Sequence, residues 1–152
     1  VIRQFPLTSL TVIGKSPEKS NLNKLIDDLD LEDKITFRSG ISEKEIVKTY
    51  HDSDIAVIPS LYEGFGFGAG EAMACGVPLI STDSGGLKQV IGDAALKIKP
   101  GSVNEIEEGI LKLFTEEKIR QELAKKGRER MEEFFDWKIA ASAYIEVFKK
   151  II

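Results

Sequence analysis

Short apolar runs alternate along this chain with longer segments that carry apolar residues at helical spacing. A strand followed by a helix returns to the same sheet through a right-handed crossover, so this alternation is typical of a parallel sheet. We therefore predict an α/β fold: a Rossmann-like open parallel sheet of about five to six strands with helices on both faces. The expected strands are Leu7–Gly14, Lys34–Gly40, Asp54–Ser60, Val77–Thr82 and Ala94–Pro100.

The segments between these strands have the periodicity of amphipathic helices. Ser42 and Glu45 have the spacing of a capping box, in which each residue bonds the main chain of the other. From Ser102 onward the pattern is wholly helical, which predicts a helical C-terminal tail. The remaining helices are expected over Glu18–Leu31, Ser42–Ser53, Ala69–Gly76 and Gly85–Asp93.

The size and composition favour one ordinary globular domain over residues 1–152, with 42% hydrophobic and 30% charged residues. A formal net charge of −4 argues against nucleic acid as a partner, because no basic excess is available for phosphates. The single cysteine, Cys75, is expected to be a buried small hydrophobe in a reducing, cytoplasmic environment. Membrane association is left open.

A glycine-rich loop follows the third expected strand. Glycine occupies every second position at Gly64, Gly66, Gly68 and Gly70, a pattern that matches neither the dinucleotide fingerprint nor a Walker A loop. A flexible strand-to-helix turn is one explanation, but glycines cost conformational entropy and a plain turn needs fewer of them. We favour a ligand that lies against the main chain, with phosphate at the following helix N-terminus. In open parallel sheets, ligands bind beyond the carboxyl ends of the strands.

Two carboxylates flank this loop. Glu71 is expected in the first helical turn, where the helix dipole alone would explain an acid, although a carboxylate there can also accept hydrogen bonds from a ribose diol. Glu63 has no such structural explanation. An acid at the mouth of a pocket suits sugar hydroxyls or the positive charge that develops at an anomeric carbon.

Other acidic patterns are interpreted as surface features. Asp28-Leu29-Asp30 is expected within an amphipathic helix, and Asp52-Ser53-Asp54 lies before a strand, at the sheet end opposite the glycine loop. His51 is expected to face solvent at a helix end. We therefore predict no metal site, and no cofactor apart from the substrate itself.

The stretch Pro59–Asp93 closely resembles the signature of glycosyltransferase family 4, retaining GT-B enzymes that use nucleotide sugars. The resemblance covers Glu63 and Glu71 as an E-x7-E pair, the segment "EAMACGVP" and the turn "STDSGG". Weaker similarity extends from about Leu10 to the final helices. The resemblance implies one half of a GT-B fold, the donor-binding C-terminal domain.

This resemblance also implies roles for matching positions. Glu63 would be the catalytic residue that faces the transferred sugar, and Glu71 would bind the donor ribose. Backbone amides of the loop would hold sugar hydroxyls and diphosphate, and main-chain atoms of the segment Phe37–Ser39 would frame the base. The implied donor-binding residues are Glu71, Gly64, Phe65, Gly66, Phe67, Gly14, Phe37, Arg38 and Ser39.

The chain departs from the family pattern in two ways. Phe67 and Gly68 stand where the family usually has leucine and proline. The strand with an arginine and a lysine that opens the family's C-terminal domain does not precede Val1, so we expect an N-terminally truncated chain that lacks the acceptor domain. The last helix, from Asp136 onward, is expected to pack onto that partner domain.

The whole protein is accordingly expected to be a hexosyltransferase that moves a sugar from a nucleoside diphosphate sugar to an acceptor with retention. The isolated chain is expected to be inactive. The alternatives are a GT-B nucleotide-sugar epimerase or phosphorylase, and a non-catalytic nucleotide-binding or interaction module.

Overall fold

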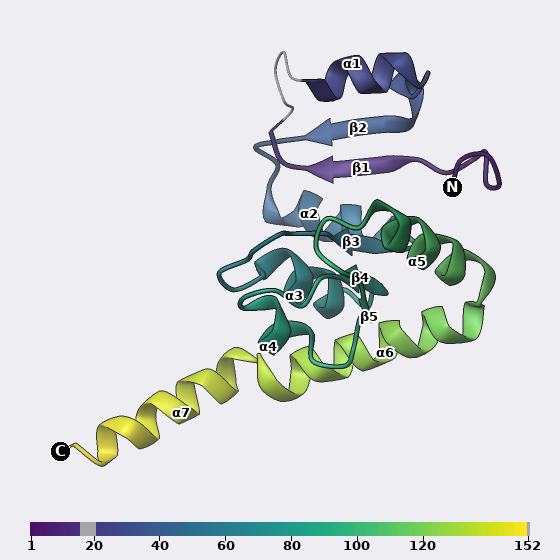
Figure 1. Ribbon diagram of the computed structural model, residues 1–152. Coiled ribbons are helices and arrows are strands. Elements are labelled where there is room, and N and C mark those ends of the chain that lie inside the picture. Colours follow the sequence, from purple (N-terminus) through teal and green to yellow (C-terminus); the bar gives the residue numbers. More distant parts are fainter. Residues whose placement is uncertain (16–20, 152) are drawn as a thin grey trace. The chain divides into compact units, whose positions relative to one another are not determined.

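The computed structural model describes residues 1–15 and 21–151, which form two compact units, Val1–Thr49 and Tyr50–Ile152 (Figure 1). The strands are β1 (Leu10–Ile13), β2 (Ile35–Arg38), β3 (Ala56–Ile58), β4 (Leu79–Ser81) and β5 (Leu96–Lys97). The helices are α1 (Asn21–Asp28), η1 (Glu32–Lys34), α2 (Glu43–His51), α3 (Phe67–Ala74), α4 (Leu87–Ile91), α5 (Val103–Thr115), α6 (Glu117–Phe134) and α7 (Trp137–Lys149).

The first unit is built around a parallel ladder of β1 and β2, in register from Leu10 opposite Ile35 to Ile13 opposite Arg38. The helix expected over Glu18–Leu31 ends earlier, at Asp28; its first expected residues lie outside the described part of the chain. The backbone turns at Asp30, which has a φ of 52°. The Asp28-Leu29-Asp30 pattern therefore spans the end of the helix and does not lie within it, although both acids are exposed as expected.

The second unit contains a parallel sheet in the order β3-β4-β5 with helices on both of its faces (Figure 1). Because side chains alternate along a strand, Leu79 joins a cluster with α3 and α4, whereas the next residue, Ile80, joins one with α5. In the same way, Ala56 belongs to the first of these clusters and Val57 packs against the second. The expected parallel α/β fold is confirmed, with its five strands paired in two sheets, one in each unit.

Helix α3 is held in the core of the second unit. Ala69, Ala72 and Met73 are fully buried, and α6 crosses them so closely that a Cβ on Gly127 would lie 3.1 Å from Met73 Cγ. At its other end the chain leaves the helix through Gly76, whose positive φ of 70° lets its N–H donate to Met73 O at 2.9 Å. These contacts fix the helix that begins directly after the glycine loop.

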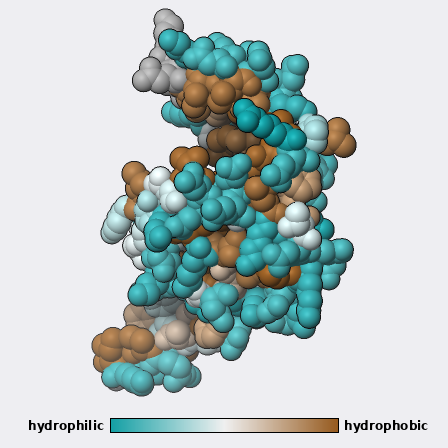
Figure 2. Space-filling view, turned by 45° about the vertical axis from the view of Figure 1, so that its right-hand side comes forward, coloured by the Kyte–Doolittle hydropathy of each residue, from teal (hydrophilic) through white to brown (hydrophobic). Residues whose placement is uncertain are grey.

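The C-terminal tail is helical, as expected, and none of the described residues of α7 is buried. Large hydrophobic side chains on this helix are exposed, with Trp137 at 88%. Figure 2 shows this mixture of hydrophobic and hydrophilic surface at the lower left, where α7 lies. The other exposed hydrophobic residues of α7 are Ile139, Tyr144, Ile145, Val147 and Phe148.

Candidate functional site

The N-terminus of α3 has no side-chain cap. The helix begins at Phe67, earlier than the expected Ala69, and its N-cap is Gly66 in a left-handed conformation with φ 99°. A Cβ on Gly66 would also lie 2.6 Å from Leu87 Cδ2, so both the backbone and the packing require glycine here. No side chain accepts a hydrogen bond from the first turn.

This arrangement leaves main-chain donors available at the loop. Gly70 is the first residue whose N–H bonds back within the helix, to Gly66 O at 3.1 Å. The N–H groups of the preceding turn, Phe67 to Ala69, have no intrahelical acceptor, as at every helix start. With the partial positive charge of the helix N-terminus, they form a suitable site for an anion such as phosphate.

A second glycine turn packs against the loop and supports it. The N–H of Gly86 donates to Glu63 O at 2.8 Å, and a Cβ on Gly86 would overlap the carbonyl oxygen of Gly64. Gly85 is equally constrained: its φ is 60° and a Cβ there would overlap Glu63 O. The "STDSGG" segment therefore contains its glycine pair because two backbones meet without room for a side chain.

The surroundings of the four loop glycines show which of them the structure of the chain itself explains. Gly66 is explained by its own φ and by Leu87. Gly68 and Gly70 lie inside α3, where a Cβ would meet neighbouring side chains at ordinary contact distances of 3.5 and 3.6 Å. Of the four, only Gly64 faces open space, because a Cβ added there would have no atom within 4 Å. Packing and φ thus explain Gly66, whereas Gly64 has free space beside its main chain for a ligand; the predicted ligand contacts of Gly64 and Gly66 stay predictions.

Glu63 is half-buried and is oriented by a hydroxyl cluster. Ser60 Oγ donates to Glu63 Oε2 at 3.3 Å, and the Ser60 carbonyl accepts from Thr82 Oγ1 at 2.7 Å and from Ser84 Oγ at 3.1 Å. These three hydroxyl residues were not identified from the sequence. The available signal was their position: Ser60 follows β3 and the other two follow β4, the neighbouring strand, at the same edge of the sheet.

Glu71 lies one turn into α3, and the first turn contains no acid. The expectation that Glu71 belongs to the first turn is therefore wrong, because the helix starts earlier than the sequence pattern indicates. The helix dipole, which acts within that turn, no longer explains this exposed acid. Tyr50, also missed from the sequence, places its hydroxyl 3.4 Å from Glu71 Oε2 and 3.1 Å from Gly68 O.

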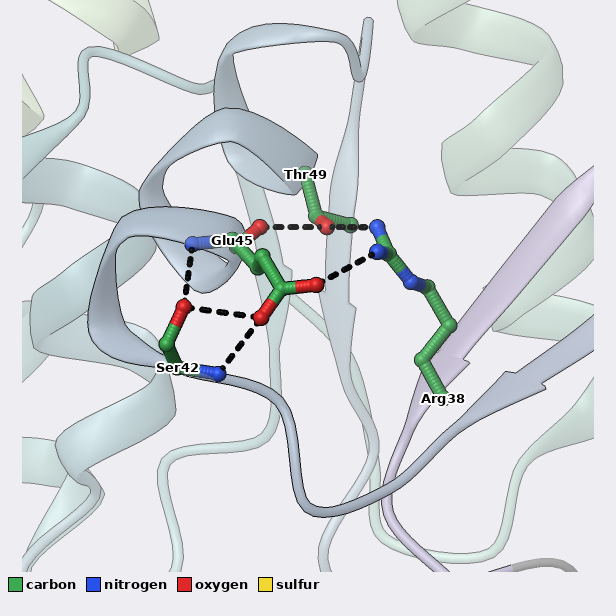
Figure 3. A network of polar contacts seen from close by, with 4 residues as sticks. All are labelled: Arg38, Ser42, Glu45 and Thr49. Carbon is green, nitrogen blue, oxygen red and sulfur yellow. Dashed lines mark hydrogen bonds and ion pairs between the residues drawn. The ribbon is translucent and has the colours of Figure 1, made fainter.

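In the first unit, the structure brings together Gly14 and Arg38, whose main chains are joined by a hydrogen bond from Gly14 N to Arg38 O at 2.9 Å. The Arg38 guanidinium is directed toward α2, where it donates to Thr49 Oγ1 at 2.8 Å and lies 3.6 Å from Glu45 Oε1 (Figure 3). Phe37 is half-buried and Ser39 is exposed. That these residues share a pocket with the glycine loop stays a prediction.

The capping box at α2 is confirmed (Figure 3). Ser42 N donates to Glu45 Oε2 at 2.9 Å, and Glu45 N donates in return to Ser42 Oγ at 3.4 Å. Hydrogen bonds from the Ser42 main chain and side chain, and then the charge of Arg38, lower the pKa of Glu45.

The remaining polar candidates lie on the surface. His51, Asp52 and Asp54 are exposed. Cys75 is half-exposed where a buried residue was expected, because it is the C-cap of α3; partial burial still raises the pKa of its thiol. Within residues 1–15 and 21–151, no three His, Cys, Asp or Glu side chains converge on a possible metal position. In the same ranges, no helix combines the length and the apolar character needed to cross a bilayer.

A parallel sheet with helices on both faces, and a glycine-capped helix that follows a strand of that sheet, define a Rossmann-like α/β fold. Residues 2–130 match the protein family described as "Glycosyl transferases group 1". The chain belongs to this family.

Known relatives agree with this assignment. The chain is 32% identical over 146 residues to MMP alpha-(1->4)-mannosyltransferase of Mycolicibacterium hassiacum, a match that covers 94% of this chain and 36% of that protein. Sucrose-phosphate synthase from Thermosynechococcus elongatus is 28% identical and superimposes with a TM-score of 0.85, over 99% of this chain and 40% of that one. This chain thus spans just over a third of the first of these proteins.

A more distant structure shares the fold. Anabaena HepE, in complex with UDP-glucose, superimposes with a TM-score of 0.84 at 20% identity, over 95% of this chain and 42% of that one.

Proposed function

We propose that this chain is the C-terminal, donor-binding domain of a retaining GT-B glycosyltransferase of family 4 and binds a nucleoside diphosphate sugar. The observation that carries this proposal is the N-terminus of α3, which has no side-chain cap and begins directly after a loop that contains Glu63. Membership of the glycosyl transferases group 1 family and the UDP-glucose bound by HepE support it.

In this proposal the donor diphosphate is held by the main-chain N–H groups at the start of α3, including that of Phe67. These groups are fixed by the buried helix and do not have to reorganise when the leaving group gains charge. Gly64 and Phe65 complete the main-chain surface under the sugar. The space beside Gly64 is open, because a Cβ added there would have no atom within 4 Å.

The two acids have different roles. Glu71 accepts hydrogen bonds from the ribose hydroxyls, since an ionised carboxylate has acceptors only. Glu63 accepts a hydrogen bond from Ser60, which orients its carboxylate. This carboxylate faces the transferred hexose near the reacting carbon and stabilises the positive charge that develops there. Gly14 and the segment Phe37–Ser39 frame the base, with the Arg38 side chain occupied by α2 and the Arg38 carbonyl bonded to Gly14 N.

The rest of the reaction belongs to the whole protein. In this proposal the acceptor site lies in an N-terminal domain, and further basic residues of the whole protein neutralise the diphosphate. No metal or cofactor is required. The isolated chain therefore binds nucleotide weakly and shows no turnover; measured turnover by residues 1–152 alone would contradict this.

The N-terminal domain is also the proposed partner of α7. The hydrophobic side chains that this helix exposes, among them Trp137 and Phe148, are suited to packing against a second domain of the same protein.

The test is Glu63→Ala in the full-length protein, after a thermal-shift panel of UDP-, GDP- and ADP-sugars has identified the donor. We expect turnover to fall by about a hundredfold or more while the nucleotide Kd changes by less than about threefold. Glu133→Ala, which removes an exposed acid of α6, is the matched control and should retain activity. Unchanged turnover in Glu63→Ala would contradict the proposed role of Glu63, whereas nucleotide binding without turnover in the wild type would indicate a non-catalytic binding module.

A further inference from the structure

The hydroxyl of Tyr50 is held in place by the core of the second unit. Tyr50 is half-buried and packs against the hydrophobic cluster that contains Ala69, Ala72 and Met73 of α3. A tyrosine ring has few rotatable bonds, so packing of the ring also fixes the hydroxyl. That hydroxyl lies 3.1 Å from Gly68 O and 3.4 Å from Glu71 Oε2.

The chemistry of this contact is defined by its partners. The Gly68 carbonyl and the Glu71 carboxylate only accept hydrogen bonds, so the phenol is the donor and its single proton is shared between them, with Gly68 O at the shorter distance. Burial, and then the negative charge of Glu71, raise the pKa of Tyr50 well above its usual value. The phenol therefore keeps the proton that it donates, and the Glu71 carboxylate lies at the outer limit of hydrogen-bonding distance from it, at 3.4 Å.

Without this contact, Glu71 would be an ordinary exposed side chain on a helix surface. A free glutamate has many rotamers and loses that freedom when a ligand fixes it. Tyr50 engages Oε2 of Glu71, which leaves Oε1 for hydrogen bonds from a ligand. A carboxylate that is oriented before the ligand arrives binds more tightly, because less ordering remains to be done.

We propose that Tyr50 is a positioning residue for the donor: its hydroxyl holds Glu71 in the orientation in which the carboxylate accepts the ribose hydroxyls. This inference rests on the proposed function and extends it, because Tyr50 acts on the nucleotide only through Glu71. The same hydroxyl also bonds Gly68 in the first turn of α3, so it ties the acid to the turn that receives the diphosphate.

The experiment measures the Kd of full-length Tyr50→Phe by titration calorimetry. The probes are UDP, GDP and ADP, used with their 2′,3′-dideoxy counterparts, which lack both ribose hydroxyls. For the nucleotide that the wild type binds, we expect the ribose form to weaken about fivefold and the dideoxy form to change less than about twofold. In the background of Glu71→Gln, Tyr50→Phe should have almost no further effect.

The control is Tyr144→Phe, which removes an exposed phenolic hydroxyl of α7 and should leave both Kd values unchanged. Equal weakening of the ribose and dideoxy nucleotides by Tyr50→Phe would indicate a merely structural role and would overturn the inference, as would no weakening of either. If Glu71→Gln showed no ribose-selective loss, the proposed role of Glu71 would itself fail. A ribose-selective loss in Glu71→Gln but not in Tyr50→Phe would overturn only the role of Tyr50.

Discussion

The N-termini of α2 and α3 differ in how the main-chain N–H groups of their first turn are satisfied. At α2, Ser42 and Glu45 satisfy each other's main-chain N–H groups at 2.9 and 3.4 Å. At α3, the N-cap is Gly66, and no side chain bonds the first turn. The first arrangement stabilises the helix with its own residues. The second forgoes that stabilisation and leaves main-chain donors that a ligand can use.

Both arrangements recur in the other described helices, and α4, with Gly86 as its N-cap, also begins without a side-chain cap. Ser102 accepts from Glu105 N at 3.3 Å at the start of α5, and Asp136 accepts from Lys138 N at 2.7 Å at the start of α7. Helix α6 also begins without a side-chain cap, at Glu116, but this residue and the next are exposed acids that would repel an anion. An uncapped start alone does not distinguish α3; its glycine loop and the adjacent Glu63 do.

The largest effect is expected where the α3 loop rests on its supporting turn. In Gly86→Ala, the new Cβ would overlap the Gly64 carbonyl, so the backbone of one segment must move. We expect a loss of about 2–4 kcal/mol in the free energy of unfolding, measured by thermal or urea denaturation. A stability equal to wild type would show that the loop is not held by this turn.

Gly64→Ala separates ligand binding from folding. No atom lies within 4 Å of the new Cβ, so the melting temperature should stay the same, whereas the methyl group would obstruct a ligand that lies on the main chain. We expect the Kd for the donor nucleotide sugar to rise about tenfold, which corresponds to about 1.4 kcal/mol. An unchanged Kd would contradict ligand contact with the main chain at Gly64.

Removing the cap of α2 should affect stability alone. Ser42→Ala loses the hydroxyl that accepts from Glu45 N, and such changes cost about 0.5–2 kcal/mol. Ser102→Ala at α5 is the matched substitution and should cost a similar amount. Nucleotide affinity should stay at its wild-type value in both variants; a loss confined to Ser42→Ala would show that the α2 end contributes to binding.

The smallest effect is a pH dependence at α2. Because the folded-state pKa of Glu45 is below its ordinary value of 4.5, the carboxylate stabilises the fold above that value, and this contribution is lost as the pH falls through the folded pKa. The difference in melting temperature between wild type and Glu45→Gln should therefore shrink on acidification from about pH 6 to about pH 3. A difference that stays constant over this range would contradict the shift.

The sequence predicted the features of the fold that depend on local pattern. The strand–helix alternation and the Ser42–Glu45 spacing are local, and the structure confirms both. The predicted start of α3 was wrong because the actual start depends on the positive φ of Gly66. Glycine permits this conformation but does not require it. Tyr50 and Thr82 were missed because each meets its partner across more than 20 positions of the chain.

The most direct test of a ligand role for the α3 N-terminus is a crystal structure of the full-length protein with the unreacted nucleotide sugar that it binds best. We expect the diphosphate oxygens within hydrogen-bonding distance of the main-chain N–H groups that begin α3, with Glu71 on the ribose and Glu63 beside the sugar. A donor bound elsewhere, with the N-terminus of α3 in contact with bulk water, would contradict the claim that this helix was left uncapped for a ligand.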